Sequence, residues 1–94
     1  MPEQTLEKEI TVVNKAGLHA RPASAIVMAV SASDSAVRIT NIETGAEADG
    51  ASTMSMLTLS APFGTRLRIT VTGKDAEQVL ASVVRLFETG FGED

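Results

Sequence analysis

The residues best suited to chemistry in this sequence lie in the segment LHARPA, residues 18–23. The segment contains His19, the only histidine of the chain, and Arg21 two positions later. An imidazole has an ordinary pKa of about 6.5, so much of it is neutral at cellular pH, and a neutral imidazole is a nucleophile toward phosphoryl groups. A guanidinium can balance the charge of the incoming phosphate. The pair therefore indicates phosphoryl transfer, with a phosphohistidine as the product.

Pro22 places this segment at the beginning of a helix. Apolar residues recur at helical spacing after it and predict an amphipathic helix over residues 20–31. Because proline is tolerated in the first turn of a helix but not in its interior, the helix should begin just before Pro22, with His19 at or beside the N-cap. Unpaired amides and the helix dipole make such a terminus an anion site. The amides expected to hold the phosphate oxygens are those of Ala20, Arg21 and Ala23.

These residues also have simpler interpretations. A lone histidine after a glycine-containing loop is often a surface residue or a weak cap. Arg21 alone could be a solvated charge, and Pro22 alone could be a plain helix starter. Spacing by itself therefore leaves the phosphoryl-transfer interpretation and the structural one open.

Composition limits the classes of protein to which the chain can belong. Its 94 residues suffice for one domain, 1–94, and 44% apolar residues is an ordinary globular balance. No apolar run reaches the roughly 18 residues of a membrane span, and the first ten residues, MPEQTLEKEI, lack the pattern of a secretory signal. Because the sequence also has no cysteine, we expect a cytoplasmic protein without membrane insertion. A carrier this small is expected to be a monomer.

Nucleic acid, metal ions and cofactors are not expected ligands. The net charge of −4 has the wrong sign for binding phosphate backbones, and three phenylalanines are the only aromatic residues that could stack on bases. One histidine and no cysteine leave carboxylates as the only metal ligands, and no calcium-loop spacing assembles them. No second base or nucleophile pair accompanies His19, which favours a stoichiometric carrier over an enzyme.

Periodicity predicts the elements that position this site. Alternation of apolar and polar residues indicates four strands, and helical spacing indicates three helices. The strands are expected over 6–13, 36–42, 46–49 and 66–72, and the helices over 20–31, 52–57 and 75–90. Asp75 and Gln78 have the spacing of a capping pair, and Gly90 is typical of a helix stop. Helices covering one face of a mainly antiparallel sheet make this an α+β domain of two layers.

The segment GLHARPAS, residues 17–24, resembles the active-site signature of the HPr family, the histidine-containing phosphocarriers of the bacterial phosphoenolpyruvate-dependent phosphotransferase system. The resemblance implies an open-faced sandwich, in which three helices cover one face of a four-stranded antiparallel sheet in the order βαββαβα. It also implies that phosphorylated enzyme I, charged by phosphoenolpyruvate, transfers a phosphoryl group to Nδ1 of His19. A histidine of an EIIA protein would then receive the group. By the same resemblance, Arg21 is the active-site arginine and Pro22 the helix-start proline.

Two longer segments are similar to the nitrogen-related branch of this family, called NPr, which serves regulation rather than sugar uptake. They are ITVVNKAGLHARPA, residues 10–23, and LFETGFGED, residues 86–94. Both branches use the same chemistry, so the HPr of the sugar-uptake system remains an alternative. A protein of a different class, a regulator that binds partners without being phosphorylated, is a further alternative, although families of that kind lack the histidine.

Ser52 stands at the position that carries a regulatory serine in many HPr proteins. Phosphate at a helix start is favoured by the helix dipole and could repel an acidic partner surface, so HPr kinase/phosphorylase is a candidate partner. The competing interpretation is that Ser52 is the N-cap of a short helix. Ala51, at a position where many family members carry a basic residue, favours the capping role.

Met54 and Leu57 lie on the short helix that, in the family, docks with enzyme I and EIIA. An apolar patch rimmed by Arg21, Ser24 and Thr53 would suit a transient interface, and methionine side chains adapt to several partners. Spacing alone leaves open whether Met54 and Leu57 are exposed or belong to the core.

Overall fold

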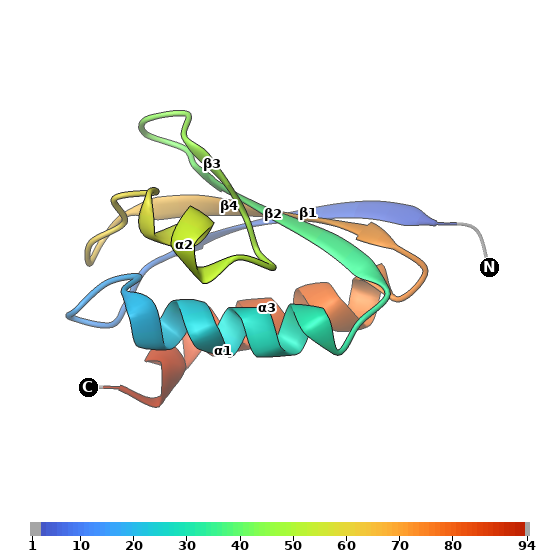
Figure 1. The fold of residues 1–94 in the computed structure, drawn as a ribbon. Helices are drawn as coiled ribbons and strands as arrows, with labels where there is room; N and C mark the ends of the chain where they lie inside the picture. Colours follow the sequence, from blue (N-terminus) through green and yellow to red (C-terminus); the bar gives the residue numbers. More distant parts are fainter. Residues whose placement is uncertain (1–2, 94) are drawn as a thin grey trace.

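The computed structural model describes residues 3–93 of the chain. Residues 1, 2 and 94, which belong to the single domain expected over 1–94, lie outside the described residues. Between residues 3 and 93 the chain forms four strands and three α-helices in the expected order (Figure 1). The elements are β1 (Gln4–Thr11), α1 (Ala20–Ser31), β2 (Ser35–Asn41), β3 (Glu47–Asp49), α2 (Thr53–Leu57), β4 (Arg66–Gly73), α3 (Ala76–Glu88) and a final 3₁₀ turn, η1 (Gly90–Gly92).

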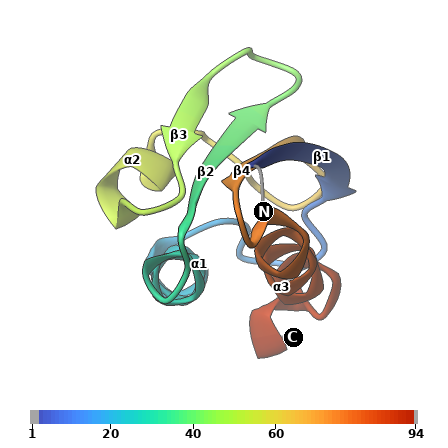
Figure 2. The same ribbon diagram turned by 90° about the vertical axis from the view of Figure 1, so that its right-hand side faces the viewer.

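The strands form one antiparallel sheet, and the helices cover one of its faces. The strand order is β1-β4-β2-β3, and each pair of neighbours is antiparallel. Seen end-on, α1 and α3 lie side by side beneath the sheet, and α2 lies next to β3 (Figure 2). The other face of the sheet is open. The expected α+β class with two layers is therefore confirmed. None of the helices in residues 3–93 is long and apolar enough to cross a membrane.

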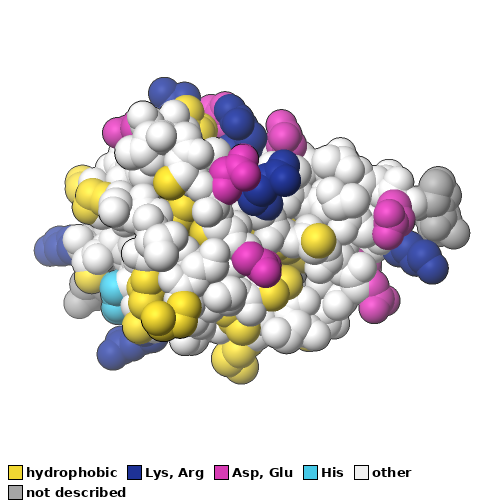
Figure 3. All heavy atoms as spheres, turned by 45° about the horizontal axis from the view of Figure 1, so that its top comes forward, with side chains coloured by type: hydrophobic (Ala, Val, Ile, Leu, Met, Phe, Trp, Pro, Cys, Tyr) yellow, Lys and Arg dark blue, Asp and Glu magenta, His cyan; other side chains and the backbone are white. Residues whose placement is uncertain are grey.

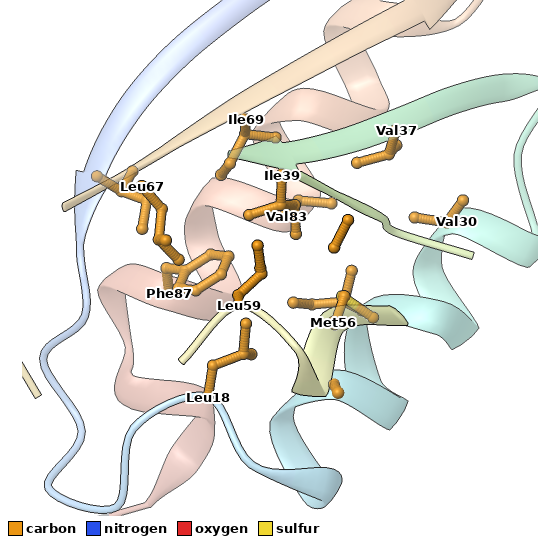
Figure 4. Packing of buried hydrophobic residues seen from close by; sticks show 14 of the residues in the cluster. Leu18, Val30, Val37, Ile39, Met56, Leu59, Leu67, Ile69, Val83 and Phe87 are labelled. Carbon is orange, nitrogen blue, oxygen red and sulfur yellow. The ribbon is translucent and has the colours of Figure 1, made fainter. Parts of the chain in front are cut away.

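The core fills the space between the sheet and the helices. Three alternating residues of β4 are fully buried: Leu67, Ile69 and Val71. They belong to one cluster with residues of all three helices, including Phe87 of α3 (Figure 4). The polar residues of the same strand lie on the open face, where Nη2 of Arg66 is 3.3 Å from Oε1 of Glu9 in β1. The alternation that predicted this strand thus also predicted which face is buried.

The first strand begins and ends two residues earlier than alternation alone predicted. The expected range was 6–13, whereas β1 spans Gln4–Thr11. The partner strand decides these limits, because the ladder runs from Gln4 opposite Gly73 to Thr11 opposite Arg66, where β4 begins. The other predicted bounds agree with the observed ones to within one residue, except that α3 ends at Glu88, two residues before the predicted end.

The N-terminus of α3 differs from the predicted capping pair of Asp75 and Gln78. Asp75 is the N-cap residue, but its side chain makes no capping hydrogen bond, and its backbone lies outside the extended region usual for a capping residue. Its carboxylate instead accepts hydrogen bonds from the Asp34 amide, at 3.0 Å, and from the Ser35 hydroxyl. These bonds lower the pKa of Asp75. The side chain therefore ties the loop after α1 to the start of α3. At the other end α3 stops as predicted, because Gly90 takes a φ of 63°.

α2 presents Met54 and Leu57 to solvent and Met56 to the core. Met56 is fully buried (Figure 4), whereas Met54 is 76% and Leu57 41% exposed. The sequence pattern left this choice open because a helix of five residues has too few turns to define a stripe. Packing of α2 against α1 and β3 determines which of its side chains are buried.

The two methionines of α2, Met54 and Met56, provide a matched test of which face of the helix is buried. Met56→Ala should lower the free energy of unfolding by about 2–5 kcal/mol, because it removes a fully buried side chain and leaves a cavity. Met54→Ala, on the same helix, should change it by no more than about 0.5 kcal/mol. Urea unfolding followed by circular dichroism measures both values. Equal effects of the two substitutions would mean that α2 is turned differently.

The loop before α1 is held against the loop before β4 by a close backbone contact at Gly17. The Leu18 amide donates to the Ala61 carbonyl oxygen at 2.9 Å. A β-carbon at Gly17 would lie 2.6 Å from that oxygen and 2.8 Å from Cα of Pro62, and Gly17 has a φ of 72°. Only glycine meets both conditions without displacing one of the loops. The contact fixes the chain two residues before His19.

Comparing alanine substitutions at two glycines with positive φ distinguishes the cost of the steric clash at Gly17 from the cost of a left-handed backbone. Gly64, at a φ of 91°, has open space around it, so Gly64→Ala should cost about 1 kcal/mol of stability for the left-handed backbone alone. Gly17→Ala should cost about 1–3 kcal/mol more, because the new methyl group overpacks two backbone segments. Thermal and urea unfolding of the two variants give the difference. If both cost the same, the loops are not in tight contact.

Candidate functional site

His19 is the N-cap residue of α1, as predicted. Its backbone is extended, with φ −104° and ψ −166°, and its carbonyl oxygen accepts the first hydrogen bond of the helix from the Ala23 amide at 3.0 Å. The imidazole makes no capping hydrogen bond to the backbone. Its side chain is 39% exposed. The ring is therefore accessible to another protein at the N-terminal end of a helix.

The ring of His19 is held by the carboxylate of Glu93, which lies 74 positions later in the sequence. Nε2 of the ring is 3.0 Å from Oε2 and 3.2 Å from Oε1. Glu93 reaches the ring because α3 ends at the end of the molecule at which α1 begins, and the segment after α3 stays at that end (Figure 1). The side chain of Glu93 is only 15% exposed. Every hydrogen bond of the His19 ring to residues 3–93 is made at Nε2.

Asn14 holds Glu93 from the interior of the protein. It is buried, and its Nδ2 donates to Oε1 of Glu93 at 2.9 Å and to the carbonyl oxygen of Gly17 at 2.7 Å. The hydrogen bond from His19 lowers the pKa of Glu93, and the bond from Asn14 acts in the same direction, while burial opposes them. Glu93 is therefore ionised at neutral pH, and an ionised carboxylate can only accept hydrogen bonds.

Two basic side chains flank the histidine (Figure 3). Nη1 of Arg21 lies 4.0 Å from Oε2 of Glu93, and the Arg21 side chain is 83% exposed. Lys15, which the sequence analysis did not single out, lines the same shallow hollow of about 460 Å³ as His19, Arg21 and Glu93. Within the part of the chain that the structure describes, the hollow thus combines two cations, one carboxylate and a helix N-terminus. Among residues 3–93, no three His, Cys, Asp or Glu side chains gather closely enough to hold a metal ion.

The backbone amides at the start of α1 require one correction. Ala23 was expected to bind phosphate oxygens, but its amide donates to the carbonyl oxygen of His19. The physical reason is that the carbonyl of an N-cap residue accepts the first bond of the helix, here from the residue four positions later. Ala20 and Arg21 belong to the first turn, where amides have no partner within the helix, and Pro22 has no amide proton. Two amides, rather than three, are therefore available to an anion.

Hydrophobic surface lies directly beside the histidine (Figure 3). Met54 and Leu57 are exposed on α2, Ser24 is exposed on α1, and Thr53 is half-buried. We call these four residues the α1–α2 patch. Their side chains are exposed or half-buried, and their role as a partner interface stays a prediction. Met28, exposed one turn beyond Ser24 on α1, was not anticipated.

Ser52 is the N-cap of α2. Its hydroxyl oxygen accepts a hydrogen bond from the Ser55 amide at 3.1 Å, and its carbonyl oxygen accepts one from the Met56 amide. The capping interpretation of this residue is therefore confirmed. Regulatory phosphorylation of Ser52 by HPr kinase/phosphorylase stays a prediction.

The sequence analysis missed Glu93, whose carboxylate holds the ring, and Asn14, whose side chain holds that carboxylate. No local pattern connects Glu93 to His19 or to Asn14, because these contacts span 74 and 79 positions of the sequence. The one available signal is the pair Gly90 and Gly92, which indicates that the chain turns after its last helix. The direction of that turn depends on where α3 ends relative to α1.

The sequence has relatives among known phosphocarriers. A family model described as "PTS HPr component phosphorylation site" matches residues 6–89. The phosphocarrier protein NPr of Escherichia coli (strain K12) is 36% identical over 90 residues, which cover 96% of this chain and 99% of that protein. The multiphosphoryl transfer protein of Salmonella typhimurium is 37% identical over 94 residues, which cover 99% of this chain but 25% of that protein. This chain therefore spans about a quarter of the length of that relative.

Solved structures have the same fold. The crystal structure of HPr-C-His from Thermoanaerobacter tengcongensis superposes with a TM-score of 0.86 at 30% identity, covering 95% of this chain and 98% of that one. The phosphocarrier protein HPr from Bacillus anthracis str. Ames gives a TM-score of 0.81 at 28% identity, covering 88% and 96% of the two chains. With a family model matched over most of its length and a histidine at the N-cap of α1, the chain belongs to the HPr family of the phosphotransferase system.

Proposed function

We propose that this chain is a cytoplasmic phosphocarrier that accepts a phosphoryl group from phosphorylated enzyme I on Nδ1 of His19 and donates it to a histidine of an EIIA protein. The observation that carries the proposal is the position of the only histidine, half-exposed at the N-cap of α1 with Arg21 beside it. The carrier is stoichiometric, since the phosphoryl group is bound covalently to the chain itself, at its one histidine, and each chain passes on the group that it received.

Acceptance of the phosphoryl group is a direct displacement at phosphorus. The lone pair on Nδ1 of His19 forms the new N–P bond, while the bond from phosphorus to the donor breaks and its electron pair stays with the donor. The amides of Ala20 and Arg21 are available to the phosphoryl oxygens, and the helix dipole favours their negative charge. The guanidinium of Arg21, already within 4.0 Å of Glu93, has enough exposed length to move to the phosphoryl group.

The shallow site suits a carrier better than an enclosed one would. A donor histidine and an acceptor histidine must each approach the same nitrogen in line, so both partners have to dock over the same surface. Hydrophobic surface lies beside the histidine (Figure 3), and the α1–α2 patch offers an adaptable methionine, Met54, together with Leu57, Ser24 and Thr53. A small apolar patch binds weakly enough to release each partner after transfer.

Within the family we assign the chain to the regulatory, nitrogen-type branch. The support is the match to NPr along almost the full length of both chains, together with the similarity of residues 10–23 and 86–94 to that branch. The identity to the multiphosphoryl transfer protein is nearly the same, so percentage identity alone does not decide the branch. The HPr of the sugar-uptake system is the competing assignment.

The carrier function predicts one acid-labile phosphoryl group on His19. After incubation with phosphoenolpyruvate and the cognate enzyme I, intact mass spectrometry should show a single added phosphoryl group that disappears on brief acid treatment. His19→Ala should abolish it, because no other imidazole is present, whereas Ser52→Ala should retain it. An acid-stable group, or one that survives His19→Ala, would contradict the proposal. Absence of modification on folded protein with active enzyme I would favour a regulator that binds partners without phosphorylation.

The branch assignment predicts which acceptor competes best. Phosphorylated protein offered equal amounts of a nitrogen-type and a sugar-specific EIIA should phosphorylate the nitrogen-type acceptor about tenfold faster or more, a difference of about 1.4 kcal/mol in activation free energy. Quenched samples resolved by mass give the two rates. A reversed preference would assign the chain to the sugar-uptake branch and leave the carrier function intact.

A further inference from the structure

The segment that follows α3 has a conformation that brings the carboxylate of Glu93 to His19. Gly90, Phe91 and Gly92 take φ values of 63°, 58° and 73°, three successive residues in the left-handed region. We call residues 89–93 the C-terminal strap. Its backbone is closed by a hydrogen bond from the Glu93 amide to the Gly90 carbonyl oxygen at 2.9 Å. A left-handed conformation is costly for the non-glycine residue Phe91, so other contacts must hold the strap in place.

Two contacts hold the strap. The ring of Phe91 packs edge-on against Phe87 of α3, with centroids 4.8 Å apart. At the far end, the buried side chain of Asn14 donates to Oε1 of Glu93 at 2.9 Å. The strap is therefore anchored on one side by the core and on the other by the loop that precedes His19. Both anchors serve to place the Glu93 carboxylate at the imidazole.

The contact between the carboxylate and the ring selects a tautomer of His19. An ionised carboxylate has no proton to donate, so the proton between Nε2 and the Glu93 oxygens belongs to the ring. A neutral imidazole carries one proton only, and with that proton on Nε2 the lone pair is on Nδ1. The same contact also fixes the angle of the ring, because both carboxylate oxygens lie within 3.2 Å of Nε2.

We propose that Glu93 is a positioning residue for phosphoryl transfer, which holds His19 as the Nε2–H tautomer and so makes Nδ1 the atom that accepts the phosphoryl group. The role rests on the carrier function proposed above. When Nδ1 forms the N–P bond, the bond to the donor breaks with its electron pair, and the proton stays on Nε2. The ring then gains positive charge, and the adjacent carboxylate stabilises it, as buried carboxylates do for other catalytic histidines.

The charge of Glu93 and its ability to accept a hydrogen bond can be separated by two substitutions. Glu93→Ala removes both properties, whereas Glu93→Gln removes the charge but keeps a carbonyl oxygen that can accept from Nε2. Glu88→Gln is the matched control, because it makes the same charge change at an exposed position in the last turn of α3. Thermal unfolding of each variant checks that the fold is kept.

The first readout needs no partner protein. ¹⁵N NMR of the imidazole of His19, recorded where the ring is neutral, should show the Nε2–H tautomer in the wild type and in Glu88→Gln. Glu93→Ala should show a mixture of the two tautomers, and Glu93→Gln an intermediate distribution. A wild-type spectrum dominated by Nδ1–H, or a tautomer ratio unchanged in Glu93→Ala, would overturn the proposal.

The second readout is the rate of transfer from phosphorylated enzyme I, measured by rapid quench. Glu93→Ala should slow it about 10–100-fold, the usual effect of removing a residue that orients a functional histidine. Glu93→Gln should recover part of the rate, and Glu88→Gln all of it. A shifted tautomer with an unchanged rate would overturn the positioning role while the carrier function stands. A wild-type protein that accepts no phosphoryl group would overturn the carrier function, and the positioning role with it.

Discussion

Packing of α1 and α3 against the same face of the sheet is the constraint on which the rest of the structure depends. The two helices run in opposite directions beneath the sheet, so the first turn of α1 and the last turn of α3 lie at the same end of the molecule (Figure 1). Fully buried side chains from both, including Ile26 and Phe87, fix this arrangement. Each contributes about 1.5–3 kcal/mol through burial, more than an exposed ion pair. The charged residues of the site are therefore not needed to hold the fold together.

The polar residues at this end form a short chain of hydrogen bonds that passes from the interior to the surface. It starts at buried Asn14, continues through Glu93 and ends at the half-exposed ring of His19. The fold holds the side chains of Asn14 and Glu93 in place, whereas the ring of His19 stays accessible to solvent. Arg21 and Lys15 provide positive charge in the same hollow, so an anionic group can bind beside the ring. A phosphocarrier must bind the phosphoryl group strongly enough to accept it and weakly enough to pass it on.

The elements with complete local patterns were predicted well. α1 lies where periodicity and Pro22 predicted it, and β4 has the buried face that its alternation predicted. Elements whose limits or orientation depend on a partner were predicted less well. The limits of β1 are those of its ladder with β4, and the register of the five-residue α2 comes from its packing against α1 and β3. Asp75 was misassigned for the same reason, because its carboxylate binds a loop 40 residues earlier rather than its own helix.

The sequence by itself determined that a histidine stands at the N-cap of a helix, next to an arginine and a first-turn proline. These are local properties, since a helix start is decided by the few residues around it. Only the tertiary structure decided what holds the ring. Glu93 reaches His19 because α3 ends at the same end of the molecule as the start of α1 and because three successive left-handed residues turn the chain there. The same holds for Met54 and Leu57, whose exposure follows from the packing of α2. Contacts between distant parts of the chain arise from burial of the core, and no local pattern encodes them.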